Sequence, residues 1–148
     1  MINDVIPFPA TLGRICRHPC ESHCNRSDFD EPLAINALER FLGDWAVNNR
    51  LPLGRLQGDQ YDEWIGVVGA GPSGLSFAYQ LARRGYRVTV YEAKAEAGGM
   101  LRYGVPDYRL PPAILDAEVA RILELGVELK VNTRIGRDIT LEELRKRH

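Results

Sequence analysis

A glycine-rich loop between a predicted strand and a predicted helix constrains the fold of this chain most strongly. The strand is the apolar run of residues 64–69, and the helix covers residues 73–84 and stops at Gly85. The loop between them reads GAGPSG, a GxGxxG pattern made of Gly69, Ala70, Gly71, Pro72, Ser73 and Gly74. A second strand of alternating, β-branched character, residues 87–91, follows the helix. This order predicts an α/β fold with a parallel sheet.

Each part of the loop has a role in dinucleotide binding. Gly69 permits a tight turn, Gly71 lets the backbone approach a pyrophosphate, and Gly74 lets the helix lie close to the strand. The phosphates would then lie at the positive end of the helix. A carboxylate at Glu92 can accept hydrogen bonds from both ribose hydroxyls and disfavours a 2′-phosphate, so NADP is disfavoured at this loop. The alternative is a glycine-rich turn without a ligand.

Composition and charge exclude several classes of protein. The chain has 148 residues, 45% of them hydrophobic and 26% charged, which fits one soluble globular domain with an appendage. A formal net charge of -1 leaves no basic surplus for nucleic acid or for an acidic membrane surface. The apolar stretches are too short for a membrane span, and Asp4 and Pro7 do not suit a signal peptide. We therefore expect a cytoplasmic protein without a nucleic acid partner.

The chain divides near residue 60. Asp30, Glu31 and Pro32 offer a capping acid and a proline for a first turn. Apolar residues at helical spacing follow them, which predicts a helix over residues 32–48. Residues 49–63 hold proline and glycine without periodicity, as in a linker. We expect a small helical segment with its linker over residues 1–60 and the N-terminal part of a dinucleotide-binding domain over residues 61–148. In the second part we predict a further helix from Leu115, a strand over residues 127–131 and a final helix that starts at Thr140.

Three cysteines, Cys16, Cys20 and Cys24, lie close together in the first segment. A disulfide framework needs an even number of cysteines spread across a fold, so metal ligation fits this pattern better. A zinc site would need a fourth ligand such as His18 or His23. Unliganded thiols are the remaining alternative.

Several motifs resemble those of one flavoprotein family. The residues PFPATLGRIC from Pro7 and PCESHC from Pro19 resemble the PFP…GR(V/I)C…PCExxC signature of the glutamate synthase small subunit family. The N-terminal region of dihydropyrimidine dehydrogenase and the flavin subunit of electron-bifurcating transhydrogenases share this signature. The residues EPLAI from Glu31, with LER from Leu38, resemble the helix that follows it, and YGVPDYRLP from Tyr103 is similar to YGIPxFRLP. The resemblance extends from about residue 7 to the end of the chain.

The resemblance implies that the dinucleotide is FAD. The residues EAKAEAGGML from Glu92 resemble the ExxxxxGG stretch of flavoproteins with two dinucleotide domains, although a double glycine can also be an ordinary turn. Besides the glycine loop and Glu92, the implied FAD-binding residues are Gly99, Met100, Arg109 and Ile135. Arg109 matches an arginine beside the flavin, where a guanidinium stabilises negative charge on the reduced ring; a plain surface charge is the alternative.

The family also implies iron–sulfur ligands. Cys16 and Cys20 would serve one [4Fe-4S] cluster, with Glu39 at the position of an unusual side-chain ligand, and Cys24 would serve another. A cluster normally takes four protein ligands, so both sets are incomplete in this sequence. The family's NAD(P)H domain is missing as well, and we therefore interpret the chain as a fragment that is inactive by itself.

The function implied for the parent protein is that of a flavin-dependent oxidoreductase. It would pass electrons between NAD(P)H, FAD and iron–sulfur clusters, together with a redox partner subunit or domain. No acid/base pair or nucleophile triad is evident, so we name no catalytic residue; in such enzymes the cofactors carry the chemistry. The alternative is a non-catalytic module that binds a nucleotide and docks subunits.

Overall fold

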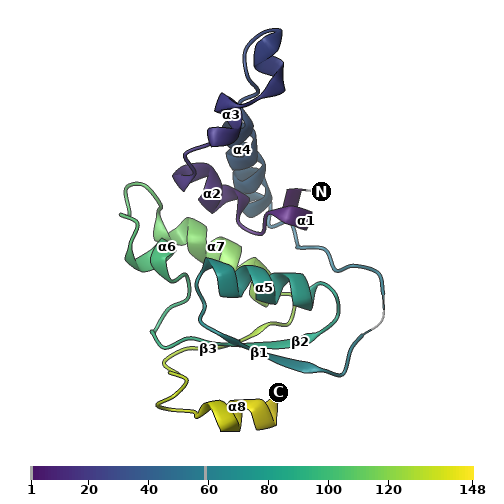
Figure 1. Cartoon of the computed structure of the whole chain (residues 1–148), viewed down its shortest axis with the longest axis vertical. Helices are drawn as coiled ribbons and strands as arrows, with labels where there is room; N and C mark the ends of the chain where they lie inside the picture. The colour runs from purple at the N-terminus through teal and green to yellow at the C-terminus, as the bar shows by residue number, and fades with distance from the viewer. Residues whose placement is uncertain (1, 59) are drawn as a thin grey trace.

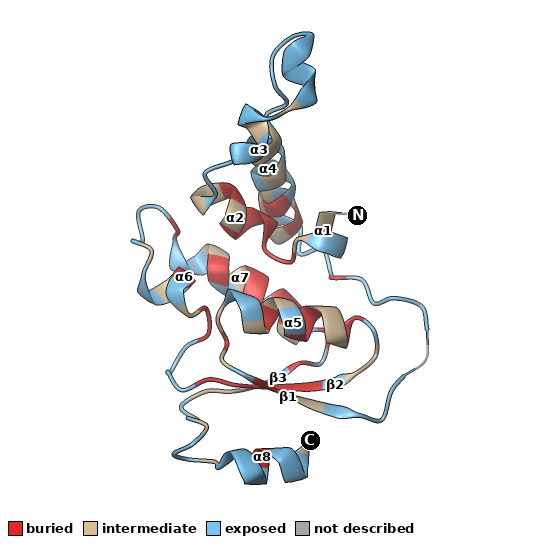
Figure 2. Ribbon diagram, viewed as in Figure 1, coloured by how far each residue is buried: buried red, intermediate tan, exposed pale blue. Residues whose placement is uncertain are grey.

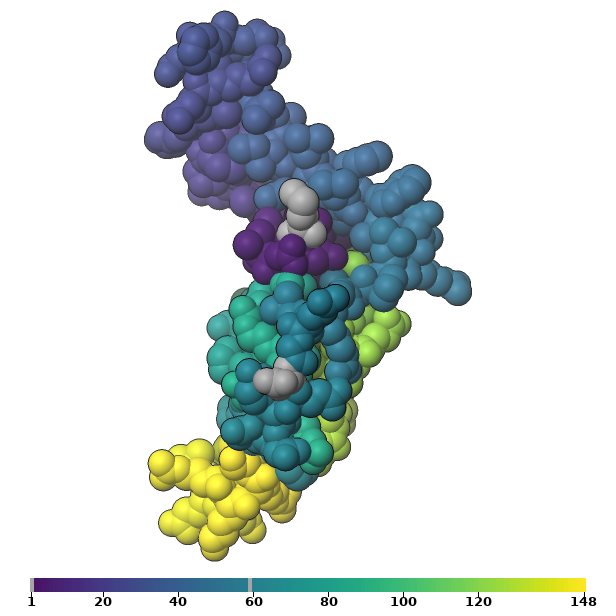
Figure 3. Space-filling view, turned by 90° about the vertical axis from the view of Figure 1, so that its right-hand side faces the viewer, coloured from purple at the N-terminus to yellow at the C-terminus, as the bar shows by residue number. Residues whose placement is uncertain are grey.

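A helical part precedes an α/β part along the chain (Figure 1). The computed structural model describes residues 2–58 and 60–148. The helical part contains α1 (Ile2–Val5), α2 (Pro9–Ile15), α3 (Pro19–Ser22), the 3-10 helix η1 (Asn25–Asp28) and α4 (Ile35–Asn48). In the space-filling view the segment around α3 and η1 forms one end of an elongated molecule, and the C-terminal helix forms the other (Figure 3).

The α/β part is built on a parallel sheet, as the sequence predicts. Its strands are β1 (Trp64–Val68), β2 (Arg87–Tyr91) and β3 (Glu128–Lys130), in the order β1-β2-β3. The helices are α5 (Pro72–Ala82), α6 (Met100–Tyr103), α7 (Pro112–Leu123) and α8 (Leu141–Arg147). Helices α5 and α7 lie on one face of the sheet and α8 lies on the other (Figure 1). This arrangement confirms the expected α/β class with a Rossmann-type strand–helix–strand unit.

The core lies between the sheet and the helices α5 and α7 (Figure 2). Helix α5 buries Leu75, Ala78, Tyr79 and Ala82, which recur at helical spacing on one face. The central strand β2 is buried from Val88 to its end because it has a neighbour on each side and helices above it. Full burial of each large apolar side chain contributes about 1.5–3 kcal/mol. This burial holds α5 on the sheet, and α5 in turn positions the glycine loop that leads into its first turn.

Helix α2, which the sequence analysis did not predict, attaches the helical part to the α/β part. It packs against α4 where Gly43 has no side chain; a Cβ there would lie 2.2 Å from the backbone nitrogen of Ala10. Phe8, just before α2, is 2% exposed and belongs to the same apolar core as Val67 of β1. The two parts of the chain therefore share one core.

Glu118 of α7 binds the beginning of α2. Its carboxylate is fully buried and accepts hydrogen bonds from the backbone N–H groups of Ala10 and Thr11, both at 2.8 Å. These N–H groups lie in the first turn of a helix, where no intrahelical acceptor exists. Burial raises the pKa of Glu118 above the ordinary glutamate value, and the hydrogen bonds from Thr11 and Ala10 oppose this rise. Glu118 thus positions the segment that leads into Cys16.

The structure corrects the predicted beginning of the helix α4. The helix begins at Ile35 rather than at Pro32, and its first N–H groups are not capped by Asp30. Instead, Oε1 of Glu21, from α3, accepts a hydrogen bond from the Asn36 N–H at 2.8 Å. The sequence pattern predicted a capping acid directly before the helix. The acid that folding brings to this end is Glu21, from an earlier segment.

Four large apolar side chains of α4 face outward. Leu38, Phe41, Leu42 and Trp45 are between 44% and 63% exposed, while Gly43 and Ala46 are buried. The small residues lie on the face that packs against other helices because they let α2 approach the backbone of α4 closely. None of the helices among residues 2–58 and 60–148 is both long enough and apolar enough to cross a membrane.

Candidate functional site

The glycine loop lies at the carboxyl ends of β1 and β2. Gly69, the residue after β1, has a φ of 96°, a conformation that favours glycine, and its N–H donates to the Tyr91 carbonyl at 2.8 Å. Gly71 is the N-cap residue of α5, and Pro72 occupies the first turn of this helix. The N–H groups of the first turn of α5 have no intrahelical acceptor, so they can bind an anion.

The surface next to this helix end consists of backbone. A Cβ on Gly69 would meet no atom within 4 Å, and a Cβ on Gly71 would meet only the Cα of Gly99, at 3.8 Å. Gly99 has a φ of 53°, and a Cβ on it would lie 2.7 Å from the Cα of Gly71. The two glycine motifs, distant in sequence, therefore place bare backbone side by side. This open space beside a helix N-terminus fits a pyrophosphate.

Gly74 lies against the preceding strand rather than in the open space. A Cβ at this position would lie 2.0 Å from the carbonyl oxygen of Gly69 and 3.4 Å from Cγ1 of Val67. The absence of a side chain at Gly74 lets α5 begin close to the end of β1. Ser73, the residue before Gly74, is exposed on the first turn of α5.

Glu92 connects the glycine loop to the segment that follows β2. The residue is 8% exposed; its Oε2 accepts a hydrogen bond from the Ala70 N–H at 2.8 Å and its Oε1 from the Lys94 N–H at 2.9 Å. The sequence pattern indicates only ribose hydroxyls as partners of this carboxylate and gives no sign of its contacts with the loop. Each carboxylate oxygen has two lone pairs, so these bonds leave acceptor capacity for a ribose.

Met100 and Ile135 are two further residues of the expected FAD set, and both lie in segments that follow β2 along the chain. Met100 follows Gly99 as the first residue of α6 and is 70% exposed. Ile135 is half-buried and forms a β-bridge with Ile139. The chain just before Ile135 lies beside the end of β2, because the Thr133 N–H donates to the Glu92 carbonyl at 2.8 Å.

Arg109 connects the YGVPDYRLP segment to the end of α2, directly before Cys16. Its side chain is exposed, and its Nη2 donates to the carbonyl of Ile15, the last residue of α2, at 3.4 Å. Cys16 is the next residue, so the arginine expected beside the flavin lies next to the cysteine segment. Sequence spacing alone contained no signal for this contact.

The cysteines do not form a closed metal site. Cys16 and Cys20 are exposed, Cys24 is half-buried, and all are free thiols. Backbone hydrogen bonds, first from Leu33 and then from Arg26, lower the pKa of the Cys24 thiol and favour the thiolate that binds metals. Among the described residues, no three His, Cys, Asp or Glu side chains are grouped so that they could hold a metal ion, and half-buried Glu39 completes no such set. These donors do not fit a [4Fe-4S] cluster by themselves.

We expect the purified chain to contain little or no iron–sulfur cluster. Clusters need nearly complete thiolate ligation, and the cysteines of this chain are not gathered around a common point. Assays of iron and acid-labile sulfide after anaerobic reconstitution measure the content directly. A full complement of iron that disappears in the Cys20→Ser variant would show that folding does close a cluster here.

Two family models match consecutive parts of the chain. The model described as dihydropyrimidine dehydrogenase domain II, 4Fe-4S cluster, matches residues 1–51. The model described as NAD(P)-binding Rossmann-like domain matches residues 67–119, which include the glycine loop, β2 and most of α7. The fold and the matches together define a segment of an iron–sulfur domain followed by a nucleotide-binding Rossmann-like fold.

Curated relatives resemble nearly the whole chain. The NADP(+)-dependent formate dehydrogenase subunit beta of Moorella thermoacetica is 44% identical over 91% of this chain and 22% of its own length. The NAD-dependent dihydropyrimidine dehydrogenase subunit PreT of Escherichia coli O157:H7 is 40% identical over 92% of this chain and 33% of its own. The glutamate synthase [NADPH] small chain of Bacillus subtilis (strain 168) is 35% identical over 94% of this chain and 28% of its own.

The relatives confirm the resemblance that the motifs indicated: the chain is similar to the glutamate synthase small chain, to PreT and to the formate dehydrogenase subunit beta, all of them named as oxidoreductase chains or subunits. It spans between 22% and 33% of the length of these three relatives.

Proposed function

We propose that this chain is the FAD-binding segment of a flavin-dependent NAD(P)H oxidoreductase with iron–sulfur clusters. The observation that carries the proposal is the bare backbone of Gly71 and Gly99 beside the N-terminus of α5. A pyrophosphate would lie against this backbone, and Glu92 would accept the ribose hydroxyls while it holds the loop. FAD, when bound, supplies the exchange of hydride equivalents for single electrons.

The proposed FAD set is the one expected from the motifs. It comprises Gly69, Ala70, Gly71, Pro72, Ser73, Gly74, Glu92, Gly99, Met100, Arg109 and Ile135. Within it, Arg109 would place a positive charge beside the flavin, next to the end of α2. This neighbourhood supports a function in which the flavin and the cysteine segment work together.

For the cysteine segment the proposal is narrower. A [4Fe-4S] cluster would need further donors besides Cys16, Cys20, Cys24 and Glu39. Within residues 2–58 and 60–148 no such donors are grouped around these side chains. We therefore assign no electron-transfer step to these side chains. The proposed division is a helical iron–sulfur segment over residues 1–60 and a nucleotide-binding segment over residues 61–148.

The proposed partners and location of the protein rest on its composition and on the names of the relatives. Formate dehydrogenase subunit beta and PreT are both named as subunits, which supports a redox partner subunit or domain for this protein. The formal net charge of -1 supports a protein that binds no nucleic acid, and we propose that the protein is cytoplasmic.

A Glu92→Gln variant tests the FAD assignment. We expect the free energy of FAD binding to weaken by about 1–3 kcal/mol, because an amide loses the charge-assisted hydrogen bonds of the carboxylate. Titration of FAD, followed by quenching of flavin fluorescence, measures the dissociation constant. Glu96→Gln is the matched control, since Glu96 is an exposed acid of the same segment. A dissociation constant unchanged by Glu92→Gln would remove Glu92 from the site.

A non-catalytic module that binds a nucleotide and docks subunits is the second candidate, and the outward apolar face of α4 favours it. Four large apolar side chains of this helix, Leu38, Phe41, Leu42 and Trp45, are exposed. Such a surface is typical of protein contacts. Reduction of bound FAD by NAD(P)H in the full-length protein separates the candidates, because a non-catalytic module would bind the nucleotide without passing electrons to it.

A further inference from the structure

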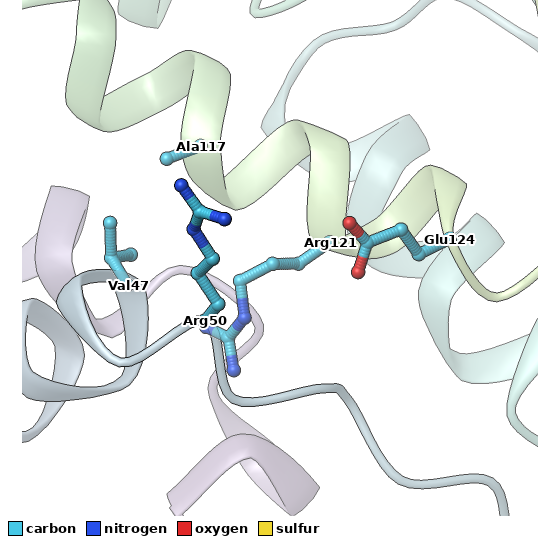
Figure 4. A pocket seen from close by; sticks show the side chains of 5 residues that line it. All are labelled: Val47, Arg50, Ala117, Arg121 and Glu124. Atoms are coloured by element: carbon cyan, nitrogen blue, oxygen red, sulfur yellow. The ribbon is translucent and has the colours of Figure 1, made fainter.

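A pocket between the end of α4 and α7 lies apart from the glycine loop and the cysteines. Its volume is about 290 Å³. It is lined by Val47, Arg50, Ala117, Arg121 and Glu124, which come from both parts of the chain (Figure 4). None of these residues belongs to the proposed FAD set or to the cysteine segment.

Arg121 is buried in this region with most of its hydrogen-bonding capacity unused. It is 6% exposed, and its Nε donates to the Leu51 carbonyl at 3.0 Å. Its Nη1 and Nη2 atoms are buried and have no hydrogen-bond partner. Burial of a guanidinium without acceptors is unfavourable, so these two nitrogens favour an oxyanion, which can accept from both at once.

The neighbouring carboxylates do not fill this role. Both oxygens of Glu118, one turn earlier on α7, accept hydrogen bonds from the N–H groups of Ala10 and Thr11. Glu124 lines the pocket and is exposed, but no ion pair within the described ranges joins it to Arg121. Two carboxylates therefore lie near Arg121, but neither has an oxygen that forms a hydrogen bond with its Nη atoms.

Arg50 supplies a second positive charge from the opposite side. It follows α4 in a left-handed conformation, with a φ of 50°, and its side chain is exposed. In Figure 4 Arg50 extends toward α7 beside Ala117, while Arg121 extends from α7 toward the turn after α4. The pocket thus has one cation at its surface and one in its interior, with the small side chains of Val47 and Ala117 between the helices.

We propose that this pocket binds a small oxyanion, a phosphate or a carboxylate group, through Arg50 and Arg121. The bound group would accept from the unpartnered Nη atoms of Arg121 once the exposed Arg50 side chain turns from Ala117 toward them. Because α4 belongs to the helical part and α7 to the α/β part, the anion would also stabilise the contact between the two.

Titration of the 148-residue chain with inorganic phosphate at constant ionic strength tests this site. Chemical shifts of backbone amides are expected to change saturably in residues 47–51 and 117–124, and the midpoint of thermal unfolding is expected to rise. Acetate in a parallel titration distinguishes a carboxylate site from a phosphate site, and saturation by either anion supports the proposal. No saturable change with either anion, or the same change with chloride, overturns it.

Two variants locate the binding. Arg50→Gln removes an exposed charge without altering the core, and we expect about tenfold weaker binding. Arg121→Met is expected to abolish binding, and Arg147→Gln, an exposed arginine on α8 at the far end of the molecule, is the control for lost charge. Unchanged affinity in Arg50→Gln overturns the proposed ligand set even if Arg121→Met does not fold.

Discussion

Gly71→Val is expected to abolish FAD binding while the chain remains folded. A Cβ at position 71 would touch only the Cα of Gly99, at an ordinary contact distance of 3.8 Å, and the φ of -79° there suits any residue. The valine side chain would instead occupy the space beside the first turn of α5 where the pyrophosphate is placed. We expect at least about a 100-fold increase in the dissociation constant of FAD, measured by quenching of flavin fluorescence.

Gly54→Val provides the control for this experiment. A Cβ on Gly54 would meet no atom within 4 Å, and this residue lies in the linker before β1. Circular dichroism shows whether each variant keeps its helices. If Gly71→Val binds FAD as tightly as the unmodified chain, the glycine loop is not the pyrophosphate site.

Gly74→Ala is expected to destabilise the fold itself. The new Cβ would lie 2.0 Å from the carbonyl oxygen of Gly69 and 3.2 Å from its carbonyl carbon. These are backbone atoms that cannot rotate away, so α5 would have to move from the sheet and open the core at Leu75. We expect the free energy of unfolding to fall by roughly 3 kcal/mol or more, measured by urea denaturation.

Ser76→Ala on the same helix is the matched control. Ser76 is half-buried on α5, and its replacement is expected to change the free energy of unfolding by about 0.5 kcal/mol or less. Equal stabilities of Gly74→Ala and the unmodified chain would mean that the loop relaxes without cost. The close packing of α5 on β1 would then have no energetic role.

The elements of the α/β part were predictable from sequence because their signals are local. The apolar run before Gly69, the helical spacing after Gly71 and the alternation over residues 87–91 each correspond to an observed element. The capping box at Thr140 is present as predicted, with the Glu143 N–H donating to the hydroxyl of Thr140. The third strand is shorter than predicted, since only Glu128–Lys130 pairs with β2.

The helical part was harder to predict because its short helices depend on distant partners. Helix α2 has seven residues, too few to be stable alone, and it exists against Gly43 of α4 and Glu118 of α7. The N-terminus of α4 is capped by Glu21 from another segment. Trp45 points outward because helix α2 contacts a different face of α4, the one that carries Gly43.

The sequence by itself determined the type of fold, the position of the glycine loop and the proteins that the chain resembles. These depend on residue types at short, regular spacings, and local backbone preferences and strand or helix periods act over such distances. Only the tertiary structure decided that Gly71 and Gly99 share one surface, that Glu92 holds the loop, that Arg109 contacts Ile15 and that Arg121 is buried against Leu51 with both Nη atoms unpartnered. Each of these features joins residues far apart along the chain, and such contacts form only when the apolar core brings helices and strands together.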